Sequence, residues 1–148
     1  MKASNNLVKL IRLMEGFSAR PYFCPAGVPT IGYGSTRYPD GTKVTIKDPP
    51  IDDEEAGKIL LENLKEYEDA VNRYVLVPLK QYQFDALVDF AYNCGAQNLR
   101  TSMLLRLVNK RDFAGAAMEF EKWVYGNGKK LPGLARRREA ERKLFKGE

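Results

Sequence analysis

Between residues 19 and 48 the helical spacing of apolar residues that marks the rest of the chain is absent. Four glycines and four prolines divide this segment into short pieces, and two of them, 30–33 and 43–46, are rich in β-branched or aromatic residues. Pro39-Asp40-Gly41 is typical of a turn. We therefore expect a small antiparallel sheet of two or three strands within an otherwise helical chain.

The segments on either side carry helix-end signals. Ser4 or Asn5 can cap a first helix that ends at Gly16, and Asp52, with Glu55 three residues later, can open a second helix with a capping box. The second helix keeps one apolar stripe through roughly six turns. Four further helical stretches are expected: Phe84 to Ala91 ending before Gly95, Thr101 to Asn109, a stretch capped by Asp112 and reaching Val124, and, after a loop at 126–133, Leu134 to Lys146.

This order of helix, small sheet, long helix and helical bundle predicts an α+β fold in which helices dominate. The expected parts are a β-lobe at about 16–50, a linking helix at about 52–75, and a helical lobe at about 80–148 that includes the N-terminal helix. With 148 residues, 44% of them hydrophobic, the chain is long enough to bury one core. We expect a single domain over residues 1–148.

The chain contains no histidine, which excludes several kinds of enzyme. Hydrolases of the Ser-His-Asp or Cys-His type need imidazole as a base, and zinc peptidases need it as a ligand. Acid and base catalysis must then fall to Glu, Asp, Lys, Tyr or Cys. This composition favours carboxylate chemistry, of which glycoside hydrolysis is a common form.

Glu15, Cys24 and Thr30 follow one another with eight and five residues between them. Glu15 lies in the last turn of the first expected helix, and the other two lie in the expected sheet region. Catalytic residues lie preferentially on loops that rigid elements hold in place. The three residues are therefore the candidate catalytic group.

Charge and targeting signals restrict the environment of the chain. Residues 129–148 carry a net charge of +5, equal to that of the whole chain, which suits either a polyanionic partner or a solvated helix face. The apolar run 7–14 is interrupted by Lys9 and Arg12 and is too short to span a bilayer. We expect neither a signal peptide nor an anchor, and two cysteines without a disulfide framework indicate a reducing compartment.

Three motifs, in order along the chain, resemble those of the phage-type lysozymes, the glycoside hydrolases with which tailed phages lyse their hosts. The first is Glu15 to Gly34, where Glu-Gly-x-x-x-x-x-Tyr and Thr-x-Gly-x-Gly surround a Glu/Cys/Thr triad. The second is Gln83 to Gly95, and the third is Leu131 to Arg142. The resemblance covers nearly the whole chain and implies a lysozyme-like fold with a cleft between a β-lobe and a helical lobe.

The activity that the resemblance implies is hydrolysis of the β-1,4 bond between N-acetylmuramic acid and N-acetylglucosamine in peptidoglycan. Glu15 would be the general acid that protonates the departing oxygen, and Thr30 would hold the attacking water. Cys24 stands where the better-studied members carry aspartate, although cysteine is also a variant of the family. It would position water, act as nucleophile or stabilise charge, so that an inverting and a retaining course both remain open.

The resemblance also implies residues outside the triad. Tyr92 and Asn93 would bind acetamido-sugar groups, and Arg137, one of three consecutive arginines, would support Glu15. Cys94 is expected to pack in the core. No cofactor and no metal ion are implied.

The implied partner is peptidoglycan, bound by a monomer that neither binds nucleic acid nor inserts stably into a membrane. Such an enzyme would remain in the host cytoplasm until a holin permeabilises the membrane, and would then act in the periplasm or on the cell wall. Two alternatives stay open. One is a lytic transglycosylase that cuts the same bond without adding water, and the other is a basic nucleic-acid-binding module that uses the helix from Arg136 to Lys146.

Overall fold

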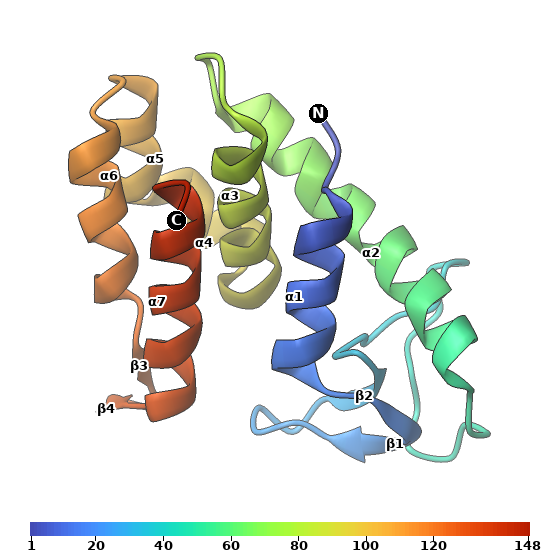
Figure 1. Cartoon of the computed structure of the whole chain (residues 1–148). Helices are drawn as coiled ribbons and strands as arrows, with labels where there is room; N and C mark the ends of the chain where they lie inside the picture. The colour runs from blue at the N-terminus through green and yellow to red at the C-terminus, as the bar shows by residue number, and fades with distance from the viewer. The chain divides into compact units, whose positions relative to one another are not determined.

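The computed structural model describes all 148 residues, and its helices and strands follow the predicted order (Figure 1). The α-helices are α1 (Asn5–Glu15), α2 (Asp53–Tyr74), α3 (Gln81–Cys94), α4 (Ala96–Thr101), α5 (Met103–Asn109), α6 (Phe113–Glu119) and α7 (Pro132–Phe145), with a 3-10 turn η1 (Phe120–Lys122). The strands are β1 (Ser18–Phe23), β2 (Pro29–Gly32), β3 (Tyr125–Gly126) and β4 (Lys129–Lys130). The predicted helix-dominated α+β class is confirmed.

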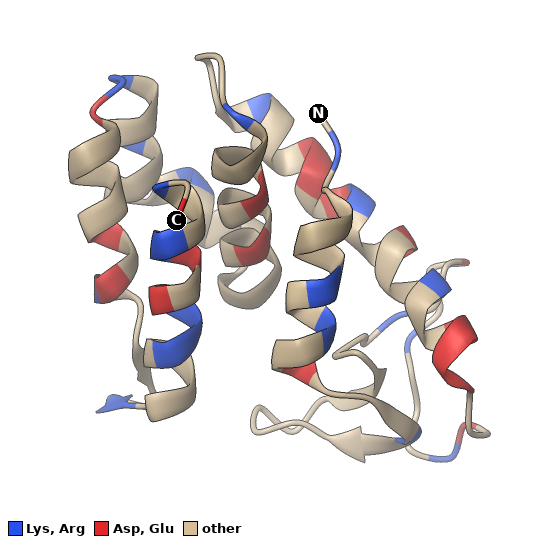
Figure 2. Ribbon diagram, in the orientation of Figure 1, with Lys and Arg blue, Asp and Glu red and all other residues tan.

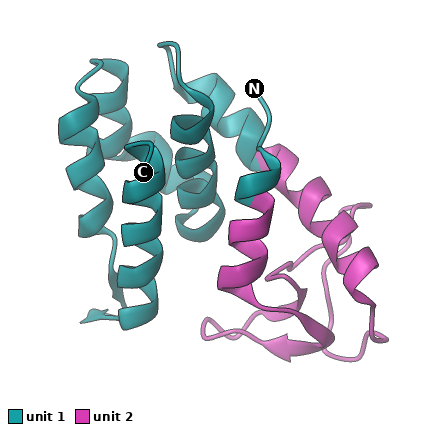
Figure 3. Ribbon diagram, in the orientation of Figure 1, with its two compact units in different colours: residues 1–7, 67–148 teal, residues 8–66 magenta.

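The chain divides into two compact units (Figure 3). Unit 1 consists of residues 1–7 and 67–148, and unit 2 consists of residues 8–66. Helices α1 and α2 each contribute residues to both units. The expectation of a single domain with the boundaries given above stays a prediction.

The predicted N-terminal caps are present at three helices. Ser4 Oγ accepts a hydrogen bond from the Leu7 amide at 3.2 Å at the start of α1. Asp52 Oδ1 accepts one from the Glu55 amide at 2.8 Å before α2, and Asp112 Oδ1 accepts one at 2.9 Å before α6. These side chains satisfy backbone donors that have no partner inside the helix.

The sheet of unit 2 has two strands. Strands β1 and β2 are antiparallel, with Tyr22 opposite Thr30 and Phe23 opposite Pro29. This agrees with the predicted two or three strands, but the β-prone piece at 43–46 is not one of them, because only an isolated bridge between Arg37 and Lys43 is formed there. Asp48 takes up one of the backbone donors instead: the amide of Thr45 donates to Asp48 Oδ2 at 2.8 Å.

Unit 1 is built around aromatic side chains where α3 packs on α7. The ring centroids of Phe90 and Trp123 are 5.2 Å apart, and those of Phe120 and Phe145 are 5.6 Å apart. Phe90, Phe120 and Phe145 are almost completely buried. No helix of the chain is both long enough and apolar enough to cross a membrane.

Two predictions in the second half of the chain were wrong in detail. The expected helix at 101–109 is interrupted at Ser102, which has extended backbone and caps α5 by accepting a hydrogen bond from the Leu105 amide. The helix expected to reach Val124 ends earlier, and the expected loop at 126–133 contains the β3–β4 hairpin. Asn127 and Gly128 both have positive φ, as a tight two-residue hairpin turn requires.

Candidate active site

Glu15 is the last residue of α1 and lies partly buried in unit 2. Gly16 ends the helix with a left-handed backbone (φ 72°), and its amide donates to the carbonyl of Arg12 at 3.0 Å. The end of the helix therefore determines where the Glu15 side chain leaves the backbone.

The Glu15 carboxyl group lies against the backbone of Gly34. A Cβ placed on Gly34 would lie 2.5 Å from Glu15 Oε2 and 2.9 Å from the carboxyl carbon, and the φ of Gly34 is +82°. Any other residue would strain the backbone and displace the carboxylate. The last glycine of the Thr-x-Gly-x-Gly motif thus provides the surface on which the acid rests.

Cys24 and Thr30 lie at the turn end of the β1–β2 hairpin. The turn is closed by hydrogen bonds from the Cys24 amide to the Val28 carbonyl at 3.0 Å and from the Gly27 amide to the Cys24 carbonyl at 2.8 Å. Thr30 is only 3% exposed, and its hydroxyl donates to the Val28 carbonyl at 2.9 Å. The hairpin therefore holds the thiol and the hydroxyl at neighbouring positions.

Local hydrogen bonds favour the thiolate of Cys24. The backbone amide of Val28 makes the largest contribution to lowering the pKa of Cys24, and the Ala26 amide and the Thr30 side chain add to it against the opposing effect of desolvation. A lower pKa makes a thiol more available as a nucleophile or as a negative charge. The turn of the hairpin thus surrounds the thiol with hydrogen-bonding groups.

Tyr22 lies on β1, in the same hairpin as Cys24 and Thr30. Its ring is directly opposite Thr30 on the paired strands, so the two side chains face the same side of the sheet. Burial raises the pKa of the Tyr22 phenol, and the negative charges of Glu15 and Cys24 raise it further. Tyr22, which the sequence analysis noted only as part of a motif, thus lies opposite Thr30 and within electrostatic range of Glu15 and Cys24.

The two cysteines, both free thiols, are expected to differ in reactivity. Desolvation raises the pKa of Cys94 to about 11, whereas the pKa of Cys24 is lowered. Since only the thiolate is alkylated, and since its fraction grows as the pH approaches the pKa from below, Cys24 will react at lower pH. At pH 8 we expect iodoacetamide to modify Cys24 at least about tenfold faster than Cys94, as measured by peptide mass spectrometry. Faster labelling of Cys94 than of Cys24 would contradict the opposite pKa shifts of the two thiols.

In unit 1, Arg137 is held by a buried carboxylate. Its guanidinium binds Asp89 on α3 through two hydrogen bonds, Nε to Oδ2 at 3.0 Å and Nη2 to Oδ1 at 2.7 Å. Arg137 is 8% exposed and Asp89 is completely buried. The structure places the predicted supporting arginine in a rigid, charge-paired position, while its support of Glu15 stays a prediction.

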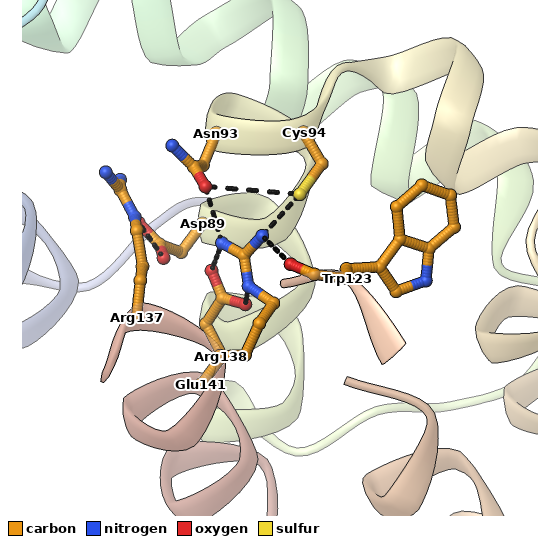
Figure 4. Close-up of polar contacts among 7 residues, drawn as sticks. All are labelled: Asp89, Asn93, Cys94, Trp123, Arg137, Arg138 and Glu141. Carbon is orange, nitrogen blue, oxygen red and sulfur yellow. Dashed lines mark hydrogen bonds and ion pairs between the residues drawn. The ribbon is translucent and has the colours of Figure 1, made fainter. Parts of the chain in front are cut away.

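Asn93 and Cys94 belong to the same polar cluster, which is organised by Arg138 (Figure 4). Arg138 Nη2 donates to Asn93 Oδ1 at 2.7 Å, and Arg138 Nη1 donates to the sulfur of Cys94. Glu141 Oε1 lies 2.7 Å from Arg138 Nε as an ion pair, and its Oε2 accepts from Arg138 Nη2 at 2.8 Å. Cys94 is thus a partner of a buried arginine rather than a purely apolar core residue.

The two buried carboxyl groups of this cluster, Asp89 and Glu141, have opposite pKa shifts. Burial, together with the hydrogen bond and charge of Asp89, raises the pKa of Glu141 well above its usual range. Burial also opposes ionisation of Asp89, but the hydrogen bond from Glu141 and the charge of Arg137 outweigh it, so the pKa of Asp89 is lowered. Asp89 is therefore the stronger acid of the two, and each carboxyl faces the guanidinium of an arginine on α7.

Tyr92 lies near the C-terminal end of α3, next to Asn93. Its ring meets that of Tyr67 edge to face, with centroids 5.4 Å apart and an interplanar angle of 87°. Because Arg138 occupies the oxygen of Asn93, the amide nitrogen is the part of that side chain that remains available to a ligand.

Several residues that build these surroundings were missed by the sequence analysis. Asp89, Arg138 and Glu141 were not singled out as partners, although Asp89 precedes Asn93 by one helical turn and Glu141 follows Arg138 by three residues. Such spacings place side chains on one helix face, but they do not show which face is buried. Burial of this face was decided by packing between α3 and α7.

Comparisons with known proteins find relatives over nearly the whole chain. The phage lysozyme family profile covers residues 12–141. The endolysin of Salmonella phage P22 is 36% identical over 145 residues, with 98% of both chains aligned. The solved structure of an endolysin from Escherichia coli O157:H7 phage FAHEc1 superposes with a TM-score of 0.89 at 34% identity and covers 98% of this chain and 93% of that one.

The chain therefore belongs to the phage lysozyme family. It is also 39% identical to the endolysin of Bacillus phage B103, but it spans only 54% of the length of that protein. Further relatives are named SAR-endolysins. Family and fold, as predicted from the sequence, are confirmed, whereas the roles of the individual site residues stay predictions.

Proposed function

We propose that this chain is an endolysin that hydrolyses the β-1,4 bond between N-acetylmuramic acid and N-acetylglucosamine in bacterial peptidoglycan and so lyses the host cell. Membership of the phage lysozyme family supports the enzyme class, a glycoside hydrolase. The observation that carries the proposal is the placement of the three candidate residues on adjoining segments of unit 2, with Glu15 against Gly34 just after β2, and Cys24 and Thr30 on the β1–β2 hairpin.

Each of the three residues has a role in this proposal. Glu15 gives its proton to the glycosidic oxygen as the bond to the anomeric carbon breaks. Thr30 holds a water molecule, and Cys24 either accepts a proton from that water or, as thiolate, bonds to the anomeric carbon before water releases the sugar. The first course inverts the configuration at the anomeric carbon, and the second retains it.

We propose that substrate is bound by residues of unit 1 as well. Tyr92 would stack on a sugar ring, and the amide nitrogen of Asn93 would donate to an acetamido carbonyl. Arg137, already fixed by Asp89, would orient Glu15. Replacement of Asn93 with Ala would then raise KM more than it lowers kcat.

Analysis of the products tests the reaction. Digestion of defined peptidoglycan should yield fragments that have gained one water, as seen by mass spectrometry, and NMR of the fresh products will distinguish inversion from retention at the anomeric carbon. A 1,6-anhydromuramoyl end without added water would instead identify a lytic transglycosylase. That alternative is not favoured, because it needs a single carboxylate and leaves Cys24 and Thr30 without a role.

Substitutions at Cys24 are expected to separate its possible roles. Cys24→Ala should lower the rate of hydrolysis of purified sacculi at least about 100-fold, because neither proton transfer nor charge stabilisation remains. Cys24→Asp should keep activity within about tenfold, because a carboxylate can perform the same task. Cys24→Ser serves as control, since it keeps a hydrogen-bonding group but cannot supply a thiolate. Wild-type lysis by Cys24→Ala would show that the thiol has no chemical role.

The nucleic-acid alternative loses support from the arrangement of charge (Figure 2). Arg137 and Arg138 are buried in ion pairs with Asp89 and Glu141, so they are not part of an exposed basic surface. Glutamates also accompany the remaining basic residues of α7, as in the pair of Arg142 and Glu139. Incubation with labelled DNA and with sacculi at increasing salt should show retention by sacculi only.

We further propose that the enzyme acts on the cell wall as a monomer and reaches it through a holin-dependent step. Because some relatives are named SAR-endolysins, this route needs its own test. Expression in host cells should leave turbidity unchanged until a holin is co-expressed or the inner membrane is permeabilised with chloroform. Lysis without either would contradict holin dependence and a cytoplasmic starting point. Sedimentation should give the mass of one chain, 16.8 kDa.

A further inference from the structure

The side chain of Tyr33, inside the Thr-x-Gly-x-Gly segment, contacts one residue that precedes Glu15 in the sequence and one that follows it. Its side chain is buried, with 6% exposure. The guanidinium of Arg12, three residues before Glu15, lies 4.9 Å from the centre of the Tyr33 ring. The ring of Phe17, two residues after Glu15, lies 5.7 Å from it at an interplanar angle of 46°.

The Tyr33 hydroxyl extends this contact to α2. It donates a hydrogen bond to Asp53 Oδ1, the carboxylate that opens the helix. Arg12 Nη2 donates to Asp53 Oδ2 at 2.8 Å and to the Tyr33 hydroxyl at 3.2 Å. The hydrogen bond from Tyr33, followed by that from Arg12, lowers the pKa of Asp53. The three side chains form a closed set of contacts between α1, α2 and the segment after β2.

These contacts lie next to the Glu15 carboxyl group. Gly34, whose backbone the Glu15 carboxyl touches, directly follows Tyr33. Glu15 itself ends a helix, and helix ends fray unless other contacts hold them. A general acid must stay within about 0.5 Å of its productive position, and a misplacement of about 1 Å can cost roughly 100-fold in rate.

We propose that Tyr33 is a positioning residue for Glu15. Its ring, which contacts Arg12 and Phe17, keeps the end of α1 against Gly34 and so fixes the orientation of the Glu15 carboxyl group. The inference rests on the proposed function, in which Glu15 is the general acid. The contacts of the ring contribute more to this positioning than the hydroxyl does, and the hydroxyl adds a hydrogen bond to Asp53. The side chains of Arg12 and Asp53 are 39% and 58% exposed, so their ion pair by itself would contribute little to fixing the end of α1.

Two substitutions and two matched controls test the proposal. Tyr33→Leu removes the ring, and Tyr33→Phe removes only the hydroxyl. Tyr38→Leu and Tyr38→Phe make the same changes at a second tyrosine of unit 2, whose hydroxyl donates to Asp48 at 2.6 Å within the loop. Rates would be measured on soluble peptidoglycan oligomers, well below the unfolding midpoint of each variant, and would be normalised to folded protein.

We expect Tyr33→Leu to lower kcat by about 10- to 100-fold while KM stays within about twofold, because the acid is misplaced and substrate binding is not. Tyr33→Phe should recover most of kcat, and both Tyr38 variants should match the wild type. A loss that appears in KM, or an equal loss in the Tyr38 variants, would overturn the positioning role. So would full activity of Tyr33→Leu while Glu15→Gln is inactive. If Glu15→Gln itself is active, the acid assignment of the proposed function fails instead.

Discussion

Glu15→Gln is expected to abolish lysis of permeabilised Gram-negative cells. The amide has the size of the carboxyl group but cannot give a proton to the departing sugar oxygen, and such proton transfer contributes roughly 10²- to 10⁴-fold to rate. Turbidity loss and release of reducing ends from sacculi would both be measured. The far-ultraviolet circular dichroism spectrum should remain that of the wild type, because Glu15 caps no helix.

A matched control is Glu54→Gln, which removes one carboxylate from the same unit. Glu54 is exposed on the first turn of α2, with only an ion pair to Lys58 at 3.5 Å. This variant should lyse cells at the wild-type rate. Retention of more than a tenth of the activity by Glu15→Gln would refute the assignment of Glu15 as the general acid.

Arg138→Ala is expected to lower the free energy of unfolding by about 3–5 kcal/mol. The side chain is 1% exposed and lies 5.4 Å from the ring centre of Phe90, so its loss opens a cavity. It also leaves Glu141 and the oxygen of Asn93 without the donor that now satisfies them. Urea unfolding followed by tryptophan fluorescence would measure the change, since Trp123 packs on Phe90.

The neighbouring Arg136 supplies the control for this prediction, because it is exposed on the same helix. Arg136→Ala should change the free energy of unfolding by less than about 0.5 kcal/mol. Similar effects of the two substitutions would mean that the cluster in Figure 4 does not hold α7 to α3.

Much of the fold could be predicted because its signals are local. The caps Ser4, Asp52 and Asp112 mark helix starts through hydrogen bonds to backbone amides three residues later. Gly16 marks the end of α1 because only a residue without Cβ adopts its left-handed conformation at no cost. These interactions span a few residues, so sequence spacing is enough to show them.

The errors arose where two local signals compete. Ser102 was read as an ordinary helical residue between Thr101 and Asn109, although its hydroxyl competes for backbone donors and restarts the helix as α5. The segment 43–46 has strand-forming residues, but its pairing with the backbone at 36–37 stops after one bridge, and Asp48 accepts the amide of Thr45 instead. The Asn127-Gly128 pair was read as a loop, although it is a strong signal for a tight hairpin.

The sequence by itself determined that Glu15 ends a helix, that Cys24 and Thr30 follow it on a short hairpin, and that the motifs are those of phage lysozymes. It could not show which of the three consecutive arginines are buried, why Cys24 and Cys94 differ in pKa, or that Tyr33 is clasped by Arg12 and Phe17. Those properties depend on desolvation and on contacts between residues far apart in the chain. Only the packed tertiary structure decides which charges lose water and which partners replace it.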